Sequence, residues 1–179
     1  MSDDSNTQIN VAQLLKSPIG TIREWDVEAT VPTLDDDARL IEPVVGRVCV
    51  IRITGGVLAQ GHFCTEVELT CDRCLGLFSV SVEFDLEEQF VSVVDVNTGR
   101  WLKMDEVDPV LLLDDHHILD LAEVFRQAIY LGLPMHPICG PECQGLCPRC
   151  GQSADEGSCG CVEDEIDPRW ESLESLREG

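Results

Sequence analysis

Residues 57–86 are VLAQGHFCTEVELTCDRCLGLFSVSVEFDL, and this stretch decides the fold. Apolar and polar side chains alternate on both sides of a central Cys-Asp-Arg-Cys turn, most regularly in the run FSVSVEFDL at residues 78–86. A period of two residues is that of a β-strand with one buried and one solvated face. The sequence therefore predicts two antiparallel strands joined by a turn that carries Cys71 and Cys74.

The flanking segments extend this sheet. Residues 44–54 are apolar and rich in β-branched side chains, and Gly55-Gly56 forms a two-residue hairpin turn into the strand at 57–70. An extended segment is expected at 21–31, a short helix at 11–16, and a further hairpin around residues 97–99. Apolar residues recur at helical spacing near 119–131, after an Asp120–Glu123 pair that resembles a capping box.

The predicted fold class is α+β. It consists of an antiparallel β-meander, or partly open barrel-like sheet, with one packing helix and a Cys-rich, zinc-binding C-terminal module. A chain of 179 residues is long enough for one such core and a small metal module. We expect a β-rich body over residues 1–135 and a Cys-rich module over residues 136–179. A short helix beginning at Asp167-Pro168 would end the module.

Residues 139–161, CGPECQGLCPRCGQSADEGSCGC, hold six of the ten cysteines and almost no apolar side chains. Such a segment cannot bury a core, so metal binding by thiolates is the simplest way to offset its loss of conformational entropy. Cys147 and Cys150 have the C-x2-C spacing of a zinc knuckle, followed by a glycine that can adopt positive φ. Cys159 and Cys161 complete a four-thiolate set, and Zn2+ is the first candidate metal.

A second four-thiolate set remains. Closing a short loop costs less entropy than closing a long one, which favours the local pairing above. That choice leaves Cys71, Cys74, Cys139 and Cys143 for a second zinc site, so one or two structural zinc ions are expected. Spacing alone leaves the other pairings open. His136 is a weaker candidate ligand, and we expect Cys49 and Cys64, which lie inside strands, to be buried structural residues.

The net charge is −22, from 34 acidic and 12 basic residues. Such a surface repels nucleic acid, because phosphate binding needs clustered Lys and Arg, and it attracts basic proteins. The polar, acidic residues 1–7 do not resemble a secretory signal, and no apolar run is long enough for a membrane span. We therefore expect a cytoplasmic protein, whose cysteines are metal ligands or redox thiols rather than disulfides.

The chain resembles the YceD-like family of large ribosomal RNA subunit accumulation proteins. The matching pieces, in order, are VAQLLK at residues 11–16, CDRCL at 71–75, the tract at 134–161 around GLCPRCG, and DPRW at 167–170. The resemblance implies a non-enzymatic role in large-subunit rRNA accumulation and ribosome assembly. It also implies a link with a basic large-subunit ribosomal protein or a pre-50S particle.

Two other functions are compatible with the cysteines. Cys147-Pro-Arg-Cys150 superficially resembles a redox C-P-x-C motif, although it lacks the βαβ setting that such motifs need. Four cysteines per site would also suit iron–sulfur ligation, although no ferredoxin-type spacing is present. No hydrolase or phosphate-binding motif occurs in the sequence, and a zinc ion closed off by four thiolates has no open position for catalysis. We therefore expect neither enzymatic activity nor a small-molecule substrate.

Overall fold

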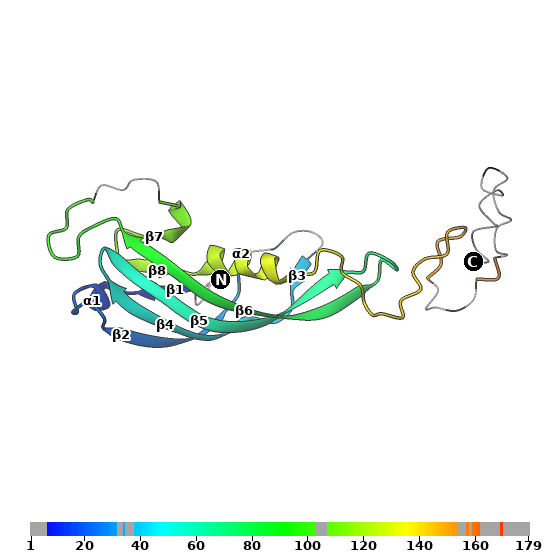
Figure 1. Ribbon diagram of the computed structural model, residues 1–179, viewed down its shortest axis with the longest axis horizontal. Coiled ribbons are helices and arrows are strands. Elements are labelled where there is room, and N and C mark those ends of the chain that lie inside the picture. The colour runs from blue at the N-terminus through cyan, green and yellow to red at the C-terminus, as the bar shows by residue number, and fades with distance from the viewer. Residues whose placement is uncertain are drawn as a thin grey trace, which may run out of the picture.

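The structure is a computed structural model and describes residues 7–31, 34, 38–102, 107–153, 157, 159–161 and 169. Its main sheet has the strand order β2-β4-β5-β6-β7, with β3 paired to β5 (Figure 1). The strands are β2 (Ile22–Ala29), β3 (Ala38–Leu40), β4 (Val44–Ile53), β5 (Gly56–Thr70), β6 (Leu77–Ser92) and β7 (Leu112–Leu113). The helix predicted to begin at Asp167 lies outside the described residues.

The long β5–β6 hairpin confirms the prediction made from residues 57–86. The two strands pair in register from Gly56 opposite Val91 to Thr70 opposite Leu77, which leaves residues 71–76 as the tip of the hairpin. The predicted β4–β5 hairpin is present, but it turns at Thr54-Gly55, one residue earlier than the predicted Gly55-Gly56 turn, and Gly56 is the first residue of β5. Gly55 has a φ of +84°. The hairpin tip projects beyond the helices at one end of the molecule (Figure 1).

The architecture is α+β, with a sheet that is mostly antiparallel but mixed. β6 and β7 run parallel, because the chain crosses over through a loop and a 3-10 helix (Pro109–Leu111) before β7. Within the described residues the sheet does not close into a barrel, since β2 and β7 stand at its two ends. The predicted α+β class is therefore confirmed, and within the described residues the sheet is open rather than a closed barrel.

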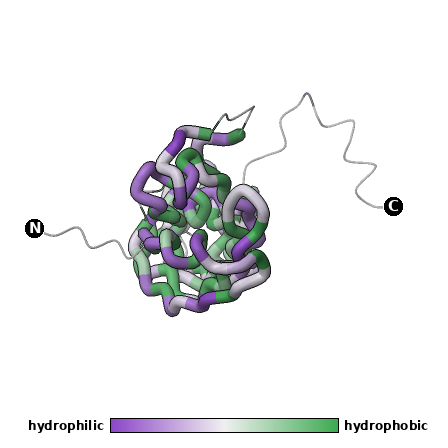
Figure 2. Tube along the Cα trace, turned by 90° about the vertical axis from the view of Figure 1, so that its left-hand side faces the viewer, coloured by the Kyte–Doolittle hydropathy of each residue, from purple (hydrophilic) through white to green (hydrophobic). Residues whose placement is uncertain are grey.

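The core lies between one face of the sheet and helix α2 (Ala122–Gly132). Phe63 on β5, Phe84 on β6 and Phe125 on α2 form an aromatic cluster, with ring centroids 4.7–5.8 Å apart. The other face of the sheet carries the polar residues of the alternating pattern. Viewed end-on, hydrophobic and hydrophilic segments are interspersed over the trace of the body (Figure 2).

Two glycines make room for the central ring of this core. A Cβ on Gly46 would lie 2.5 Å from Cδ1 of Phe63, and one on Gly61 would lie 2.8 Å from its Cε2. Contacts this short are not tolerated in a packed interior. A Cβ at either glycine would lie still closer to a backbone carbonyl oxygen of the neighbouring strand, that of His62 for Gly46 and that of Arg47 for Gly61. The two glycines therefore reflect the close approach of both the Phe63 ring and this backbone rather than a need for backbone flexibility.

Helix α2 begins later than predicted. Residues Ile118–Asp120 form strand β8, which pairs with β1 (Gln8–Asn10) in a separate two-stranded sheet. The Asp120 carboxylate accepts the N–H of Ala122, as a capping residue would, but Glu123 binds Arg126 instead of reaching back. The strand pairing therefore competes successfully with the first turn of the predicted helix.

Two smaller expectations are met in shorter form. The helix predicted at 11–16 is α1 (Ala12–Leu15), and the Asn10 side chain accepts the N–H of Ala12 at 3.0 Å. The hairpin expected around residues 97–99 is a turn with a single bridge between Val94 and Trp101, and it contains Gly99 at a φ of +66°.

Candidate metal centres

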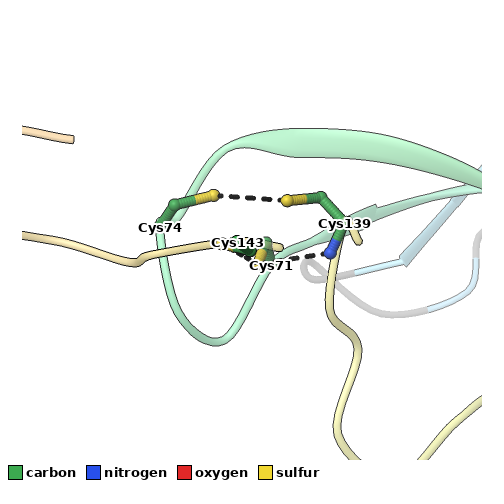
Figure 3. Close-up of side chains that lie close together, drawn as sticks. All are labelled: Cys71, Cys74, Cys139 and Cys143. Carbon is green, nitrogen blue, oxygen red and sulfur yellow. Dashed lines mark hydrogen bonds between the residues drawn. The ribbon is translucent and has the colours of Figure 1, made fainter. Parts of the chain in front are cut away.

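The tip of the β5–β6 hairpin presents Cys71 and Cys74. The N–H of Leu75 donates to the carbonyl of Cys71 at 2.9 Å, and the N–H of Cys71 donates to the carbonyl of Gly76, also at 2.9 Å. This tight loop requires a positive φ at its fifth residue, and Leu75 has a φ of +58°. Both sulfurs consequently face the same side of the hairpin tip (Figure 3).

Cys139 and Cys143 reach the tip from the segment that follows α2. The N–H of Asp72 donates to the carbonyl of Pro137 at 2.8 Å, and Nη1 of Arg73 donates to the carbonyl of Cys143 at 3.2 Å. The backbone N–H of Cys139 also points at the sulfur of Cys71, at 3.4 Å. The hairpin loop thus binds the incoming segment through its backbone as well as through its thiols.

The four sulfurs of this cluster fit a single tetrahedral ion. All four lie within 4.8 Å of one another, with Cys71 and Cys143 at 3.9 Å and Cys74 and Cys139 at 3.8 Å. With Zn–S bonds of about 2.3 Å, the edge of a regular tetrahedron is about 3.8 Å. An iron–sulfur cluster suits this geometry less well, because its thiolates bind different iron atoms and stand farther apart.

The second cluster comprises Cys147, Cys150, Cys159 and Cys161, whose sulfurs also lie within 4.8 Å of one another. Its knuckle repeats the backbone bonds of the first. Gly151 N–H donates to Cys147 carbonyl at 2.9 Å, and Cys147 N–H donates to Gln152 carbonyl at 2.8 Å. Gly151, at a φ of +73°, occupies the position that Leu75 occupies in the hairpin tip. The two C-x2-C loops are therefore the same local structure, built once on a sheet and once on an otherwise irregular segment.

The clusters differ in burial. In the first, Cys71 and Cys143 are buried, with 0% and 7% of their surface exposed. In the second, Cys147 and Cys159 are half-buried and the other two cysteines are exposed. An ion in the first cluster would be shielded on one side by the protein, whereas an ion in the second would face solvent.

In each cluster the first cysteine of the knuckle is readily deprotonated. The pKa of Cys71 is lowered to about 6, first by the backbone N–H of Cys74 and then by those of Cys139 and Arg73, against the opposing effect of burial. The backbone N–H groups of Cys150 and Arg149 lower the pKa of Cys147 to about 6 in the same way. A thiolate is thus available in both clusters to take up a cation.

Other thiols in the clusters hold their protons more tightly. The pKa of Cys139 is raised to about 12, mainly because its thiol donates a hydrogen bond to the sulfur of Cys143. The pKa of Cys161 is also raised to about 12, mainly because its thiol donates a hydrogen bond to the sulfur of Cys159. Burial is the main cause that raises the pKa of Cys143. Full deprotonation of either cluster therefore needs a bound cation to replace these protons.

Other candidate ligands fall outside the two cysteine clusters. Nδ1 of His136 lies 3.4 Å from a carboxylate oxygen of Asp72, and the imidazole is exposed. Asp114, Asp115 and His116 also gather within 4.8 Å, but all three are exposed. We attach no metal to this group, because exposed acidic clusters are common and Asp114 already accepts backbone N–H groups of its own turn.

The expectation that Cys49 and Cys64 are buried is wrong. Cys64 is exposed and Cys49 is half-buried, on the solvated face of the sheet. The alternation in β5 contained the signal, since Cys64 shares the parity of His62 and Glu66 rather than that of Phe63. The period of the strand was a better guide here than the average burial of cysteine.

Comparison with known proteins gives the family. The model of the family described as large ribosomal RNA subunit accumulation protein YceD matches residues 59–177, a span that includes both cysteine clusters. The chain belongs to the YceD family. No solved structure matches it. The family is named for rRNA accumulation rather than for a reaction, which points to a non-catalytic role.

Several curated proteins are similar to this chain. An uncharacterised protein of Mycobacterium tuberculosis is 34% identical over 121 residues, which covers 68% of this chain and 56% of the relative. A chloroplastic large ribosomal RNA subunit accumulation protein YCED homolog of Zea mays is 28% identical over 171 residues, covering 82% of this chain and 58% of the relative. The Arabidopsis thaliana homolog of the same name is 30% identical over 60 residues, covering 34% of this chain and 19% of the relative. The chain thus spans less than two thirds of the length of these relatives.

None of the helices in the described residues is both long and apolar enough to cross a membrane.

The sequence reasoning missed the role of Arg73. Its guanidinium donates a hydrogen bond to the carbonyl of Cys143 and so helps to hold together the two cysteine pairs of the first cluster, which are distant in the chain. An arginine between two cysteines gives no sequence signal for such a contact, because its partner lies far away in the chain.

Proposed function

We propose that this protein is a non-enzymatic ribosome biogenesis factor that supports the accumulation or processing of large-subunit rRNA in the cytoplasm. The observation that carries the proposal is the YceD family match over residues 59–177. The acidic body would engage a basic large-subunit ribosomal protein or a pre-50S particle through its net charge of −22. The same charge argues against direct binding of rRNA.

In this proposal both cysteine clusters hold structural zinc. Cys71, Cys74, Cys139 and Cys143 would form one site, and Cys147, Cys150, Cys159 and Cys161 the other. The sulfur spacing of the first cluster supports a single tetrahedral ion. A ligand set made up entirely of cysteine thiolates favours zinc. Four thiolates would leave no coordination position for a substrate, so the ions would act by stabilising structure. The Cys-rich module at 136–179 would then be anchored to the body at 1–135 through the first ion.

Depletion of the protein in its native host tests the functional part. The proposal expects large-subunit precursors to accumulate and mature large-subunit rRNA to fall, with small-subunit rRNA as the internal control. Re-expression of the wild-type chain should restore both, and expression of a Cys71→Ser variant should restore them only in part. Unchanged precursor and mature rRNA levels after depletion would refute the proposal.

Elemental analysis of the tag-free protein tests the metal part. About two zinc ions per chain, with eight thiols protected from a thiol reagent until a chelator is added, are expected. Bound iron would favour the iron–sulfur alternative. Metal-free protein with readily oxidised thiols would favour the redox alternative, and either result would end the structural-zinc proposal.

A further inference from the structure

The solvated face of the main sheet carries two parallel lines of carboxylates. Asp26 on β2 pairs across the sheet with Arg47 on β4, Arg47 with His62 on β5, and His62 with Asp85 on β6. Residues paired in this way point to the same face. Residues two positions before and after Asp26 on β2, and two before and after Asp85 on β6, also point to this face. The two lines are therefore Glu24, Asp26 and Glu28 on β2, and Glu83, Asp85 and Glu87 on β6.

All six carboxylate side chains are exposed. Between the lines, one arginine provides the only permanent positive charge of this face among the described residues of the four strands. Arg47 contacts Asp26 at 2.8 Å and Glu24 at 3.8 Å, while His62 lies 2.8 Å from Asp85. The face therefore keeps a strong negative charge along both margins.

The strip between the two lines is largely uncharged. Its residues are Val45, Arg47 and Cys49 on β4 and Gln60, His62 and Cys64 on β5. Arg47 and His62 each contact a carboxylate at the margin, and 43% of the Val45 surface is exposed. Around Val45 and Cys64 the face has a shallow hollow, widely open to solvent and about 700 Å³ in volume, which Asp26, Glu28 and Arg47 also line. Helix α2 packs on the opposite face of the sheet (Figure 1).

We propose that this face binds an amphipathic α-helix of a basic protein partner, with the apolar side of the helix in the hollow and its Lys and Arg side chains on the two carboxylate lines. The inference deepens the proposed function and rests on it, since it specifies how a basic ribosomal protein would be recognised. Net charge alone would indicate neither which surface of the protein binds nor which element of the partner is bound.

The dimensions suit a helix lying along the strands. The two lines are three strand spacings apart, about 14 Å, and a helix with its side chains is about 10–12 Å wide. Carboxylates two residues apart on a strand are about 6.7 Å apart, and helical residues at i and i+4 rise by about 6 Å. Successive basic residues along each flank of a helix can therefore face successive carboxylates along each line.

Other occupants fit less well. An extended peptide would pair with an edge strand rather than lie across four paired strands. A second copy of the chain would bring the same carboxylate lines together, and nucleic acid would bring further negative charge. A basic helix alone combines attraction at the margins with an apolar contact in the middle.

The test uses the full-length protein and a 16-residue peptide with an apolar stripe flanked on both sides by lysines. A peptide of the same composition, reordered so that no stripe forms, is the control. Two protein variants each remove one line, Glu24→Gln/Asp26→Asn/Glu28→Gln and Glu83→Gln/Asp85→Asn/Glu87→Gln. The control variant Glu42→Gln/Asp115→Asn/Glu142→Gln removes three exposed carboxylates that belong to neither line.

At 0.15 M salt, where distant charges are screened, each line variant should bind the striped peptide about tenfold more weakly, because each exposed ion pair contributes a factor of about two to three. The control variant should change the dissociation constant by less than about twofold. The reordered peptide should bind poorly to every protein. Circular dichroism should show the striped peptide gaining helix on binding, and unchanged metal content should show that the variants are folded.

A Val45→Asp substitution separates docking from general attraction. It adds negative charge, so attraction to the overall charge would tighten binding of the peptide, whereas docking over the hollow would weaken it by burying the new carboxylate. Tighter binding, equal losses in the line and control variants, or self-association through this face would overturn the inference. If any of these results were found while depletion of the protein still reduced mature large-subunit rRNA, the docking face would be wrong and the proposed function would stand. If depletion left rRNA unchanged, the proposed function itself would be wrong.

Discussion

The sulfur of Cys71 lies 3.9 Å from the sulfur of Cys143, although 72 positions separate them in the chain. Cys71 stands at the start of the turn between β5 and β6, and Cys143 follows α2. The intervening chain includes β6 and the helix that covers it. A metal ion shared by these two cysteines would close that whole loop and restrict the unfolded chain accordingly.

Loss of the first cluster should therefore destabilise the body. We expect Cys143→Ser to remove one zinc equivalent and to lower the free energy of unfolding by about 3–4 kcal/mol, the scale of a cross-link across a loop this long. Cys150→Ser should remove the other equivalent and leave the unfolding of the sheet unchanged, because that cluster closes only a short loop outside the core. Elemental analysis and urea denaturation followed by far-UV circular dichroism measure both effects.

The matched control for these variants is Cys64→Ser. Cys64 is an exposed cysteine on the sheet and belongs to neither cluster. Its substitution should change neither metal content nor the urea midpoint. Equal destabilisation by Cys143→Ser and Cys150→Ser would contradict the long-range role of the first cluster.

The stability of the metal-free protein should depend on pH through its thiols. The pKa values of Cys71 and Cys147 are lowered from 9.0 to about 6 in the folded chain. Their contribution to stability is therefore fully present above about pH 9 and is lost as the pH falls toward 6. The raised pKa of Cys139 acts in the opposite sense, with a contribution that is kept below pH 9 and lost as the pH rises toward 12.

Chemical denaturation of metal-free protein at pH 6.5 and 8.5 measures this dependence, and a Cys71→Ala variant should show a smaller rise in stability over that interval.

The two low-pKa thiols should differ in their rate of alkylation in the metal-free protein. At pH 7, peptide mapping after brief alkylation should find Cys147 modified before Cys71. Both form thiolates readily, but Cys71 is fully buried and Cys147 is only half-buried. Faster modification of Cys71 would show that the hairpin tip opens without metal.

The two knuckles should respond oppositely to changes at their fifth residue. Leu75 and Gly151 both have positive φ, at +58° and +73°, and this conformation costs a residue with a Cβ about 1–2 kcal/mol. Leu75→Gly should be neutral or stabilise the protein by up to about 1 kcal/mol, since glycine loses more entropy on folding and offsets part of the relief. Gly151→Leu should weaken zinc retention by the second cluster.

Competition with a chromogenic chelator measures zinc retention, and thermal unfolding measures stability. Gly140→Ala is the control, because a Cβ there meets nothing within 4 Å and the residue does not have positive φ. A strongly destabilised Leu75→Gly protein would mean that the exposed leucine side chain contributes more than its backbone strain costs.

Substitution of Gly61 should disrupt the packing of the aromatic core. A Cβ at this position would lie 2.4 Å from the carbonyl oxygen of Arg47 and 2.8 Å from the Phe63 ring. We expect Gly61→Ala to destabilise the protein by about 1–3 kcal/mol. Phe63→Leu removes part of the clash, so the double variant should lose less than the sum of the two single variants, as a double-mutant cycle by urea denaturation would show. Strict additivity would argue that the backbone contact alone sets the cost.

Local sequence was sufficient for the long strands of the main sheet and for the knuckles, but not for the short strands β1, β3, β7 and β8. Strict alternation at residues 78–86 predicted β6, and the glycine pair at 55–56 predicted its neighbouring hairpin, because the period of a strand and the turn chemistry of glycine are properties of adjacent residues. The C-x2-C spacing likewise predicted two thiol pairs facing one side. Where local reasoning failed, at the start of α2, a pairing of β8 with the distant β1 replaced the first helical turn.

The sequence by itself determined the residue types and spacings of two four-cysteine sets, the alternating strands and the acidic charge. Only the tertiary structure decided that Cys71 and Cys74 meet Cys139 and Cys143, that Cys64 faces solvent, and that carboxylates of β2 and β6 form two lines on one face. The physical reason is that each of these facts depends on strand register and chain crossover. Both are set by the packing of the whole core rather than by neighbouring residues.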